Sequence, residues 1–472
     1  MYPETHFLLN EKEMCITAPQ GMVVLDFLRR KQRLTGTKEG CREGDCGACT
    51  VLIGKLNEEQ LVYKPVASCL LPLGELHGKH LVTIEGLNMS FLSPIQQAIV
   101  DEGATQCGFC TPGIVVSLTG YVMEDHKQIT RDGIKKSLGG HLCRCTGYRS
   151  LKQTFLFLKE TVKNHAGFET LAAKRMIPGY FLEIPAKLRK IPVQNANNSE
   201  QIPEYFVAGG TDLYIQKGDI LPESRIYLLS SHPEMKEITK KNDTLRIGAY
   251  TTFEEFARHP EVIKVIPRIQ EYMSFIASLQ IRNRATLGGN IINASPIADL
   301  TILLLAMEST VVLKNGDTTR FVPMTSFFKG YKRIDKLPSE ILAEVLVPIP
   351  SSETKIDWEK VSKRKYLDVA SVNSAIKVRC RDGIIQEMGL AMGGVAPIPF
   401  FLKETAKYFL GKRISKETIE DAFSIVQKEV SPIDDIRGSN KYKRLLARQL
   451  LIAHFTKLFP EKVKVKDFYE TY

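Results

Sequence analysis

Eight of the ten cysteines in the chain fall into two groups with regular spacing. The first group has the spacing C-x4-C-x2-C…C and consists of Cys41, Cys46, Cys49 and Cys69. Four thiolates at this spacing suit a two-iron cluster. Gly44, Gly47 and Ala48 lie between the first three, so the backbone can fold tightly around the inorganic core and point amide hydrogens at its sulfurs. Tetrahedral zinc is the alternative, but structural zinc sites favour paired C-x2-C units, so the run predicts a 2Fe-2S cluster.

The second group lies further along the chain, in the segments QCGFCTPG and HLCRCTGY. Its members are Cys107, Cys110, Cys143 and Cys145. Thr111-Pro112 is a helix start signal and Gly147 precedes another expected helix, so two helix ends can close on one cluster. Zinc also suits this spacing, but the neighbouring first group favours a second iron–sulfur centre. The remaining Cys15 and Cys380 lie in strand-like segments and are interpreted as buried structural thiols without a role.

Two glycine-rich turns could bind a nucleotide. No G-x-G occurs in the chain, which excludes the Rossmann fingerprint, and the P-loop motif is also absent. FVAGGTDL at residues 206–213 follows an expected strand, and TLGGNI at residues 286–291 is followed by ASPIADL, which ends at Asp299. Paired glycines expose consecutive amide hydrogens that can hold a pyrophosphate, although an ordinary tight turn also explains each pair.

Hydrophobic patterning predicts the elements that position these residues. Residues 1–85 show two alternating segments and a helical stretch near residues 22–33, which predicts a small mixed sheet with one helix. Four helices are expected from IQQAIV, IVVSLTGYVM, DGIKKSL and LKQTFLFLKETV. The polar stretch from about residue 165 to 203, which contains three spaced prolines, is interpreted as a linker. Beyond it strands and helices mix, and Asp382-Gly383 predicts a hairpin in a final module that ends with two or three helices.

Composition excludes several classes of protein. The 472 residues, 43% hydrophobic and 25% charged, are ordinary for a globular chain of about three domains. The cationic excess of 64 Lys and Arg over 53 Asp and Glu is spread along the chain, so no nucleic-acid partner is expected. No signal peptide and no apolar run long enough for a membrane span are evident, so we expect a soluble, cytoplasmic protein without a membrane partner. Its cysteines are then reduced rather than paired in disulfides.

The segments GCREGDCGACTV, QCGFCTPGIV and LCRCTGYR, in this order, resemble the iron–sulfur portion of the xanthine dehydrogenase type of molybdenum hydroxylase over residues 1 to about 165. The resemblance implies that the first quartet binds the cluster nearer the flavin and the second the cluster nearer the molybdenum. It also implies that Gln106 touches the pterin cofactor of a partner. The two glycine-rich turns and GYKR at residues 330–333 extend the resemblance through most of residues 176–350.

The resemblance implies a bound FAD. Its binding residues would be Phe206, Val207, Ala208, Gly209, Gly210, Thr211, Asp212, Leu213, Ile276, Thr286, Gly289, Asn290, Asp299, Leu342 and Lys360. KVSKRKYLDVA resembles a segment near the flavin ring and the nicotinamide site, in which Asp368 would tune flavin reactivity. The family usually has Arg-Arg-x-x-Asp there, whereas this chain has Lys363-Arg364-Lys365 with Tyr366 and Leu367 before the aspartate. A charged strand edge is the alternative interpretation of this segment.

The fold class implied is a multidomain α+β protein. The expected domains are a plant-type ferredoxin-like β-grasp domain (residues 1–85), a four-helix 2Fe-2S domain (86–165), an FAD-binding domain of the vanillyl-alcohol-oxidase type (176–350) and a small flavoprotein C-terminal domain (355–460). The molybdopterin domain of full-length relatives does not follow EKVKVKDFYETY, so we expect that domain on a partner chain.

The implied function is electron transfer. Electrons from a molybdenum centre on a large partner subunit, where a small purine is hydroxylated, would pass through two 2Fe-2S clusters to FAD and then to NAD. A heterotetramer or larger complex is expected, and it resembles bacterial xanthine dehydrogenases with a small iron–sulfur and flavin subunit. Three alternatives remain open: a stand-alone reductase that oxidises NADH, a related hydroxylase acting on another N-heterocycle or an aldehyde, and a zinc-stapled scaffold. The substrate and the choice between NAD and oxygen are not encoded in these motifs.

Overall fold

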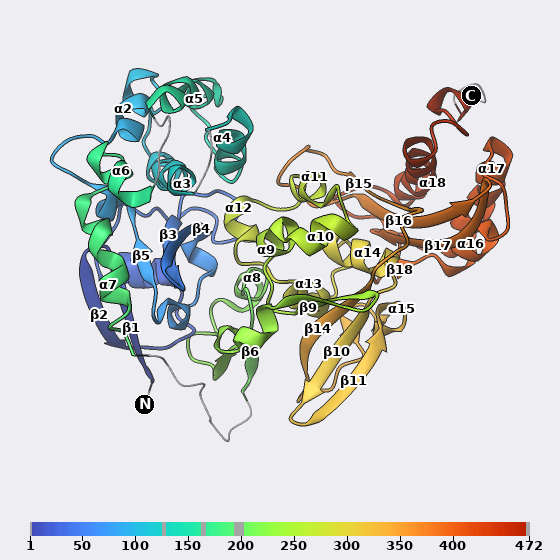
Figure 1. Cartoon of the computed structure of the whole chain (residues 1–472), viewed down its shortest axis with the longest axis horizontal. Helices are drawn as coiled ribbons and strands as arrows, with labels where there is room; N and C mark the ends of the chain where they lie inside the picture. Colours follow the sequence, from blue (N-terminus) through green and yellow to red (C-terminus); the bar gives the residue numbers. More distant parts are fainter. Residues whose placement is uncertain (1, 125–128, 162–166, 193–202, 469–472) are drawn as a thin grey trace. The chain divides into compact units, whose positions relative to one another are not determined.

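The computed structural model describes residues 2–124, 129–161, 167–192 and 203–468, which fold into two compact units (Figure 1). The first unit comprises residues 1–231 and 277–285, and the second comprises residues 232–276 and 286–472. Helices and sheets are mixed in both, which confirms the multidomain α+β fold class. No helix within the described ranges is long and apolar enough to cross a lipid bilayer.

The first unit begins with a five-stranded mixed sheet. In order across the sheet its strands are β2 (Lys12–Thr17), β1 (Glu4–Leu9), β5 (His80–Val82), β3 (Thr50–Asn57) and β4 (Gln60–Ala67). The short α1 (Val24–Asp26) continues into a π-helical turn, Phe27–Lys31, and packs on this sheet through a buried cluster that includes Phe7, Phe27 and Val51. The prediction of a small sheet with one helix is therefore confirmed.

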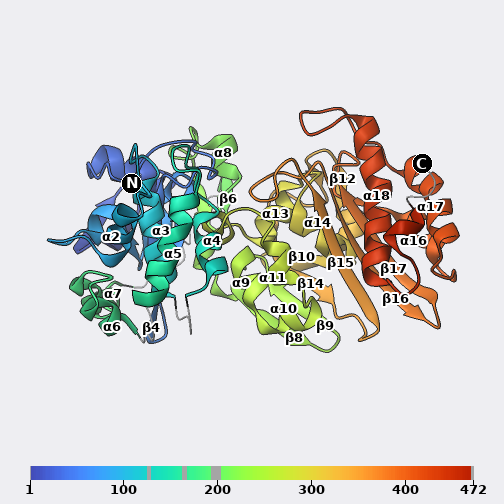
Figure 2. The same ribbon diagram turned by 90° about the horizontal axis from the view of Figure 1, so that it is seen from above.

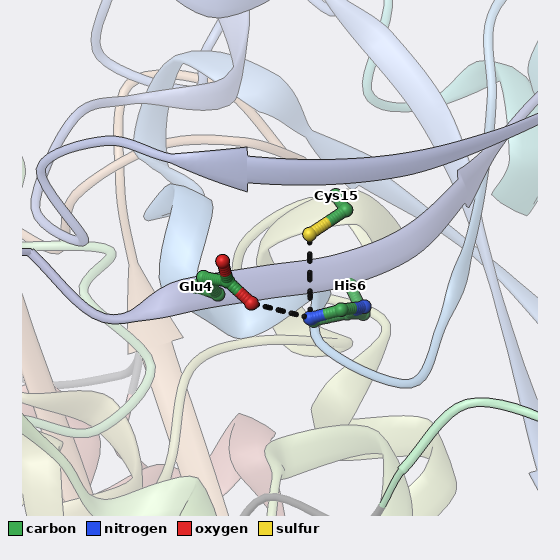
Figure 3. Close-up of side chains that lie close together, drawn as sticks. All are labelled: Glu4, His6 and Cys15. Carbon is green, nitrogen blue, oxygen red and sulfur yellow. Dashed lines mark hydrogen bonds and ion pairs between the residues drawn. The ribbon is translucent and has the colours of Figure 1, made fainter.

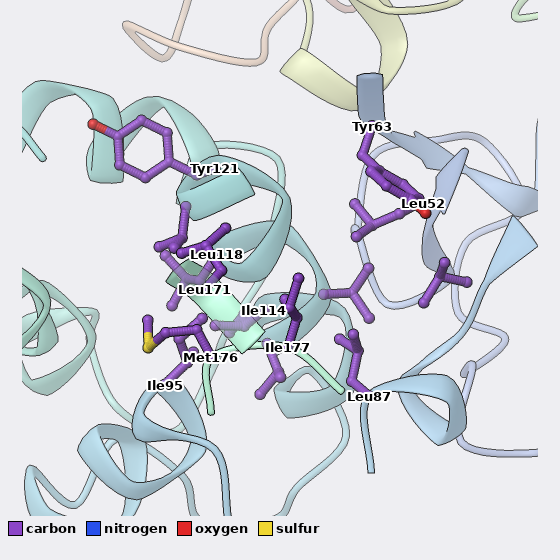
Figure 4. Packing of buried hydrophobic residues seen from close by; sticks show 14 of the residues in the cluster. Leu52, Tyr63, Leu87, Ile95, Ile114, Leu118, Tyr121, Leu171, Met176 and Ile177 are labelled. Carbon is purple, nitrogen blue, oxygen red and sulfur yellow. The ribbon is translucent and has the colours of Figure 1, made fainter. Parts of the chain in front are cut away.

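Four helices follow, as the sequence patterns predict. They are α2 (Pro94–Asp101), α3 (Thr111–Met123), α4 (Arg131–Leu138) and α5 (Arg149–Thr161). Ser93 forms a capping box with Gln96 at the start of α2, and Thr130 caps α4 by accepting a hydrogen bond from the Gly133 amide. Helix α3 is buried from Gly113 to Val122, because it lies between the sheet and the other helices (Figure 4).

The linker interpretation is wrong for residues 167–188. This stretch forms α6 (Gly167–Ala173), a 3-10 turn (Gly179–Glu183) and α7 (Ile184–Leu188). Its apolar side chains, among them Leu171 and Phe181, join the buried cluster around α3. Leu171 is labelled in Figure 4. Pro178 and Pro185 lie at the starts of these helical turns, where no amide donor is needed, so they begin structure rather than break it. The Asn-rich end of the expected linker, residues 193–202, lies outside the described residues.

The first unit also contains a β-α-β segment and a short return of the chain. These elements are β6 (Tyr205–Val207), α8 (Leu213–Lys217), β7 (Ile226–Leu228) and α12 (Leu279–Arg282). Strands β6 and β7 are parallel and join a cluster that contains Val207, Cys49 and Cys69. The segment 206–213 is therefore packed beside the first cysteine quartet.

The second unit contains a five-stranded antiparallel sheet covered by helices. Its strands, in order, are β11 (Thr318–Pro323), β10 (Thr310–Asn315), β14 (Ile341–Pro348), β9 (Thr244–Gly248) and β8 (Ile238–Lys241), with the separate hairpin β12 (Phe328–Gly330) and β13 (Arg333–Ile334). Its helices are α9 (Phe253–Arg258), α10 (Pro260–Val265), α11 (Ile269–Met273), α13 (Leu287–Asn293), α14 (Asp299–Ala306) and α15 (Met324–Phe327). A capping box between Thr252 and Glu255 starts α9.

A four-stranded antiparallel sheet and three helices complete the second unit. The strands are β15 (Thr354–Val361), β16 (Val372–Arg381), β17 (Ile384–Gly393) and β18 (Phe400–Phe401), and the helices are α16 (Lys403–Phe409), α17 (Lys416–Glu429) and α18 (Asn440–Leu458). Figure 2 shows α18 lying along this sheet, where it contacts β15 and β16. Asp382 and Gly383 both have positive φ in the turn between β16 and β17, so the predicted hairpin is confirmed.

Candidate iron–sulfur and flavin sites

The first cysteine quartet is assembled from one loop and one short turn. Cys41, Cys46 and Cys49 lie on the loop that leads into β3, and Cys69 lies in the 3-10 turn Ser68–Leu70 after β4. The thiols interact in two pairs, Cys41 with Cys46 and Cys49 with Cys69. The interaction with Cys46 is the main reason that the pKa of Cys41 lies below its usual value. The Glu43 amide also donates to Cys41 Sγ at 3.3 Å, as expected for a loop that directs amide hydrogens at sulfur.

Glycine is required at position 47 by both its backbone conformation and the neighbouring atoms. Its φ of +68° is left-handed, and a Cβ on it would lie 2.4 Å from the carbonyl oxygen of Gly140 and 2.5 Å from His141 Nδ1. Its glycine identity therefore allows the first cysteine loop to pack against the segment that leads into the second quartet.

The second quartet lies where the four helices begin and end. Cys107 and Cys110 precede α3, of which Cys110 is the N-cap, and Cys143 and Cys145 lie between α4 and α5. Cys145 Sγ is 3.6 Å from Cys107 Sγ, and Cys110 interacts with Cys143 as a second pair. Thr146 Oγ1 lies 3.1 Å from Cys143 Sγ. Cys107 and Cys145 are exposed and Cys110 is buried, so this quartet has one solvent-facing side.

The two-plus-two arrangement of the sulfurs distinguishes iron from zinc. Around one tetrahedral zinc with Zn–S bonds of about 2.3 Å, all four sulfurs would lie roughly 3.8 Å from one another. In neither quartet, all of whose members are described, do three sulfurs lie mutually within 4.8 Å. Two separate pairs are what a two-iron core with two thiolates on each iron requires. The residues present therefore fit a 2Fe-2S cluster and do not fit a mononuclear zinc site.

A hydrogen bond joins the two cysteine loops. The amide of Leu142, which directly precedes Cys143, donates to the carbonyl oxygen of Cys46 at 3.0 Å. Beside it, the buried His141 Nε2 lies 2.7 Å from Ser117 Oγ and 3.1 Å from Gln280 Nε2. Burial lowers the pKa of His141 to about 4, so the ring is neutral at pH 7. Cysteine spacing carries no signal for this buried polar cluster, which sequence reasoning missed.

Gln106, implied to touch a partner's pterin, lies at the exposed side of the second quartet. Its Nε2 donates to the carbonyl oxygen of Cys145 at 3.4 Å. Its predicted contact with a partner stays a prediction.

The first glycine-rich turn, residues 206–213, belongs to the first unit and connects β6 to α8. A Cβ on Gly209 would lie 2.1 Å from the carbonyl oxygen of Arg284, and Gly210 has a φ of +74°. The Arg284 guanidinium donates to the Gly209 carbonyl oxygen at 3.1 Å and to Glu75 at 3.0 Å. Arg284 therefore braces one side of the turn, and both glycines are needed for its shape.

The second glycine-rich turn belongs to the second unit and starts α13. Thr286 Oγ1 accepts a hydrogen bond from the Gly289 amide at 3.1 Å and caps the helix. The Asn290 side-chain oxygen accepts from the hydroxyl of Thr301 at 2.7 Å, which ties α13 to α14. These bonds hold the Thr286–Asn290 turn in a fixed shape.

Asp299 and Lys360, both predicted from the family resemblance, lie together although 61 positions separate them. Lys360 Nζ is 2.6 Å from Asp299 Oδ2, and their side chains are 5% and 14% exposed. Asn373 Nδ2 donates to the other Asp299 oxygen at 2.6 Å, and Lys360 also donates to the carbonyl oxygen of Phe275. Burial raises the pKa of Asp299 despite the opposing effect of Lys360. Sequence reasoning missed Asn373 and Phe275, because only the fold brings them to this ion pair.

Ile276 and Leu342 are apolar members of the predicted flavin set. Both are buried, with 4% exposure each; Ile276 follows Phe275, and Leu342 pairs with Leu313 in the sheet.

Asp368 lies in a loop, not on a strand edge. The loop runs from the end of β15 to the start of β16, so the interpretation as a charged strand edge is wrong. Asp368 accepts hydrogen bonds from the backbone amides of Arg364 at 2.7 Å and Val369 at 3.0 Å. Tyr366 of the same loop stacks on Phe275 with ring centroids 5.7 Å apart. Asp368 thus holds the shape of the loop, and its effect on a flavin stays a prediction.

The two cysteines outside the quartets are both in strands, as predicted. Cys380 is half-buried in β16, but Cys15 in β2 is exposed, so its interpretation as a buried thiol is wrong. The error arises because β2 is the edge strand of its sheet, where alternate side chains face solvent.

Four family models match consecutive parts of the chain. They are the 2Fe-2S iron-sulfur cluster binding domain (residues 7–73), the [2Fe-2S] binding domain (83–155), the FAD binding domain in molybdopterin dehydrogenase (194–350) and the CO dehydrogenase flavoprotein C-terminal domain (359–458). Two 2Fe-2S domains and one FAD-binding domain are therefore present in this polypeptide.

The chain is 28% identical to xanthine dehydrogenase 1 of Arabidopsis thaliana over 93% of this chain and 38% of that protein. It is 27% identical to aldehyde oxidase 1 of Rattus norvegicus over 96% of this chain and 39% of that protein. The chain thus spans less than half the length of these relatives. The structure of reconstituted CO dehydrogenase from Oligotropha carboxidovorans, 23% identical, shares the fold with a TM-score of 0.50 over 53% of this chain and 88% of that chain. From the order of its four domains and these similarities, the chain belongs to the molybdenum hydroxylase family and comprises iron–sulfur and FAD-binding domains of that family.

Proposed function

We propose that this chain is the electron-transfer subunit of a xanthine dehydrogenase-type molybdenum hydroxylase. The observation that carries the proposal is the pair of cysteine quartets, each divided into two thiol pairs and joined to the other by the bond from the Leu142 amide to the Cys46 carbonyl. Iron–sulfur clusters transfer single electrons, and a flavin can combine two of them into a hydride for NAD. The protein's part is to hold these groups at fixed positions.

The pairing of the thiols supports the proposed cluster ligands. Cys41, Cys46, Cys49 and Cys69 bind one cluster, and Cys107, Cys110, Cys143 and Cys145 bind the other. The contact between the loops shortens the path for electrons between the proposed clusters. A path from Cys143 through the Leu142 amide reaches Cys46 across one hydrogen bond.

The flavin residues are proposed separately in each unit. In the first, residues 206–213 offer backbone amides at a turn that Arg284 braces. In the second, Thr286 and Asn290 form a capped turn, and the Asp299–Lys360 ion pair places a carboxylate and an ammonium group in a nearly buried position. Each set can be tested without reference to the other.

The second quartet is where electrons enter from a molybdenum-containing partner. Phe109, between Cys107 and Cys110, is 47% exposed, and Leu142, next to Cys143, is 49% exposed. Two large apolar side chains beside exposed cluster cysteines suit the centre of a protein interface. A molybdopterin-binding large subunit that hydroxylates a purine is the proposed partner, and NAD is the proposed electron acceptor.

Purification of the chain with and without the candidate large subunit tests this function. We expect about four irons and one FAD per chain, the ratio that two 2Fe-2S clusters and one flavin require. Molybdenum should co-elute with the complex, and reduction of NAD by a purine should need both chains. An NADH-to-dye reductase that is fully active alone and binds no molybdenum protein would instead support the stand-alone reductase.

The interface is tested by Phe109→Asp. Loss of a central apolar side chain at an interface raises Kd by at least about 10-fold, and the cluster signals should persist. Leu182→Asp is the matched control, because Leu182 is 45% exposed in the same unit but lies in the turn Gly179–Glu183, apart in sequence from both quartets. Equal binding by both variants would contradict the proposed docking face.

A further inference from the structure

A third group of metal-binding side chains lies outside both quartets. Glu4, His6 and Cys15 lie on the hairpin formed by β1 and the edge strand β2, and their ligand atoms all lie within 4.8 Å of one another (Figure 3). Glu4 and His6 are two positions apart on one strand, and Cys15 is the direct cross-strand partner of His6. The pleat of the sheet therefore places all three on one face.

The two distances to His6 agree with a single ion bound by the three side chains. His6 Nε2 is 3.1 Å from Glu4 Oε2 and 3.4 Å from Cys15 Sγ. Around tetrahedral zinc, with bonds of about 2.0–2.1 Å to nitrogen and oxygen and about 2.3 Å to sulfur, the corresponding separations are roughly 3.4 Å and roughly 3.6 Å. For these two pairs, binding would need movements of only a few tenths of an ångström, and the Glu4 and Cys15 ligand atoms lie within 4.8 Å of each other.

The same geometry argues against a nucleophilic thiol. In a catalytic triad the acid contacts one ring nitrogen of histidine and the nucleophile contacts the other. Here Glu4 and Cys15 both approach Nε2 of His6 (Figure 3).

We propose that Glu4, His6 and Cys15 form a surface zinc site with a fourth coordination position open to water. One carboxylate, one imidazole and one thiolate are all common zinc ligands, and three protein ligands leave the open position found in solvent-accessible sites. Glu4 and Cys15 are exposed and His6 is partly exposed, so the ion can enter from solvent. Binding releases the thiol proton of Cys15, and the ion remains divalent.

The intact protein, with its clusters and flavin, tests the site directly. After addition of one equivalent of Zn²⁺ and gel filtration, we expect one zinc per chain with no loss of iron. Zinc K-edge absorption should report one sulfur at about 2.3 Å and nitrogen or oxygen ligands at about 2.0–2.2 Å. A shell of four sulfurs would place the zinc at a cluster quartet and overturn the proposal, as would the absence of retained zinc.

Variants and alkylation locate the ion. Cys15→Ser should remove the sulfur from the zinc shell, and His6→Ala should weaken binding by roughly 100-fold or more, since even outer partners of metal ligands cost 10–100-fold. Cys380→Ser, which changes the other cysteine outside the quartets, should bind zinc normally. In wild-type protein, Zn²⁺ should slow alkylation of Cys15 by iodoacetamide, as measured by peptide mass, and leave Cys380 unaffected. Unchanged zinc retention in both Cys15→Ser and His6→Ala would refute the assignment; unchanged iron content controls for folding.

Discussion

Gly47→Ala tests whether packing between the cysteine loops holds both clusters. The substitution has two costs: about 1–2 kcal/mol for placing a Cβ on left-handed backbone, and about 1–3 kcal/mol for overpacking. The second cost arises because the new Cβ would lie 2.4 Å from the Gly140 carbonyl oxygen, which is about 1 Å too close, and both groups belong to packed backbone. The loops must therefore move apart.

Gly78→Ala is the matched control for this experiment. Gly78 has the same φ of +68°, but a Cβ on it would meet no atom within 4 Å. It therefore carries the cost of left-handed backbone without the clash, and the two variants should differ by about 1–3 kcal/mol in apparent stability.

The assay combines iron content, paramagnetic resonance and thermal unfolding. In Gly47→Ala we expect changed signals from both clusters, because the displaced segment 140–142 leads into Cys143 while Gly47 itself follows Cys46. Gly78→Ala should retain both signals. If the two variants have the same iron content, spectra and unfolding midpoint, the inferred contact between the loops is refuted.

Three further predictions concern single sites. Cys46→Ser should remove or strongly alter the paramagnetic signal of one cluster and leave the other, because the quartets share no ligand; unchanged signals from both would contradict the ligand assignment. Gly209→Val should abolish FAD binding, because its Cβ would meet the Arg284 carbonyl oxygen at 2.1 Å, and full flavin content with normal iron would argue against this turn. The carboxylate of Asp357 is fully buried and lies 2.8 Å from His454 Nδ1. Burial opposes ionisation of Asp357, but the hydrogen bond to His454 and nearby cations lower its pKa below 3.8. The stability that this carboxylate contributes should therefore be complete above about pH 4 and be lost as the pH falls through the lower pKa of the folded state. Asp357→Asn should make stability depend less on pH over this range. Fluorescence of Trp358, the single tryptophan and the neighbour of Asp357, gives a local reading of that transition.

Local spacing predicted the features that depend on neighbours in sequence. The helix caps at Ser93 and Thr130 and the turn at Asp382-Gly383 depend on short-range hydrogen bonds, so the corresponding helices and hairpin could be expected from local sequence. The cysteine spacing likewise indicated two clusters, and the pairing of sulfurs in the fold supports iron over zinc.

Features that depend on distant partners could not be predicted in this way. Residues 167–188 were interpreted as a linker because their prolines and polar residues mask widely spaced apolar positions such as Leu171 and Phe181, whose burial depends on α3. Asn373 meets Asp299 only because α14 packs against β16. Cys15 was misjudged because a strand pattern does not reveal which strand is at the edge of the sheet.

The assignment of residues 277–285 to the first unit bears on any attempt to produce the iron–sulfur half as a separate fragment. A truncation after residue 231 would delete Gln280, Asn283 and Arg284, whose side chains bond to His141, to the Pro65 carbonyl and to the buried Glu75. Such a fragment would carry all eight cluster cysteines yet expose the surfaces that this nine-residue return covers. A minimal electron-transfer module would need that peptide grafted back, for example through a designed loop after β7.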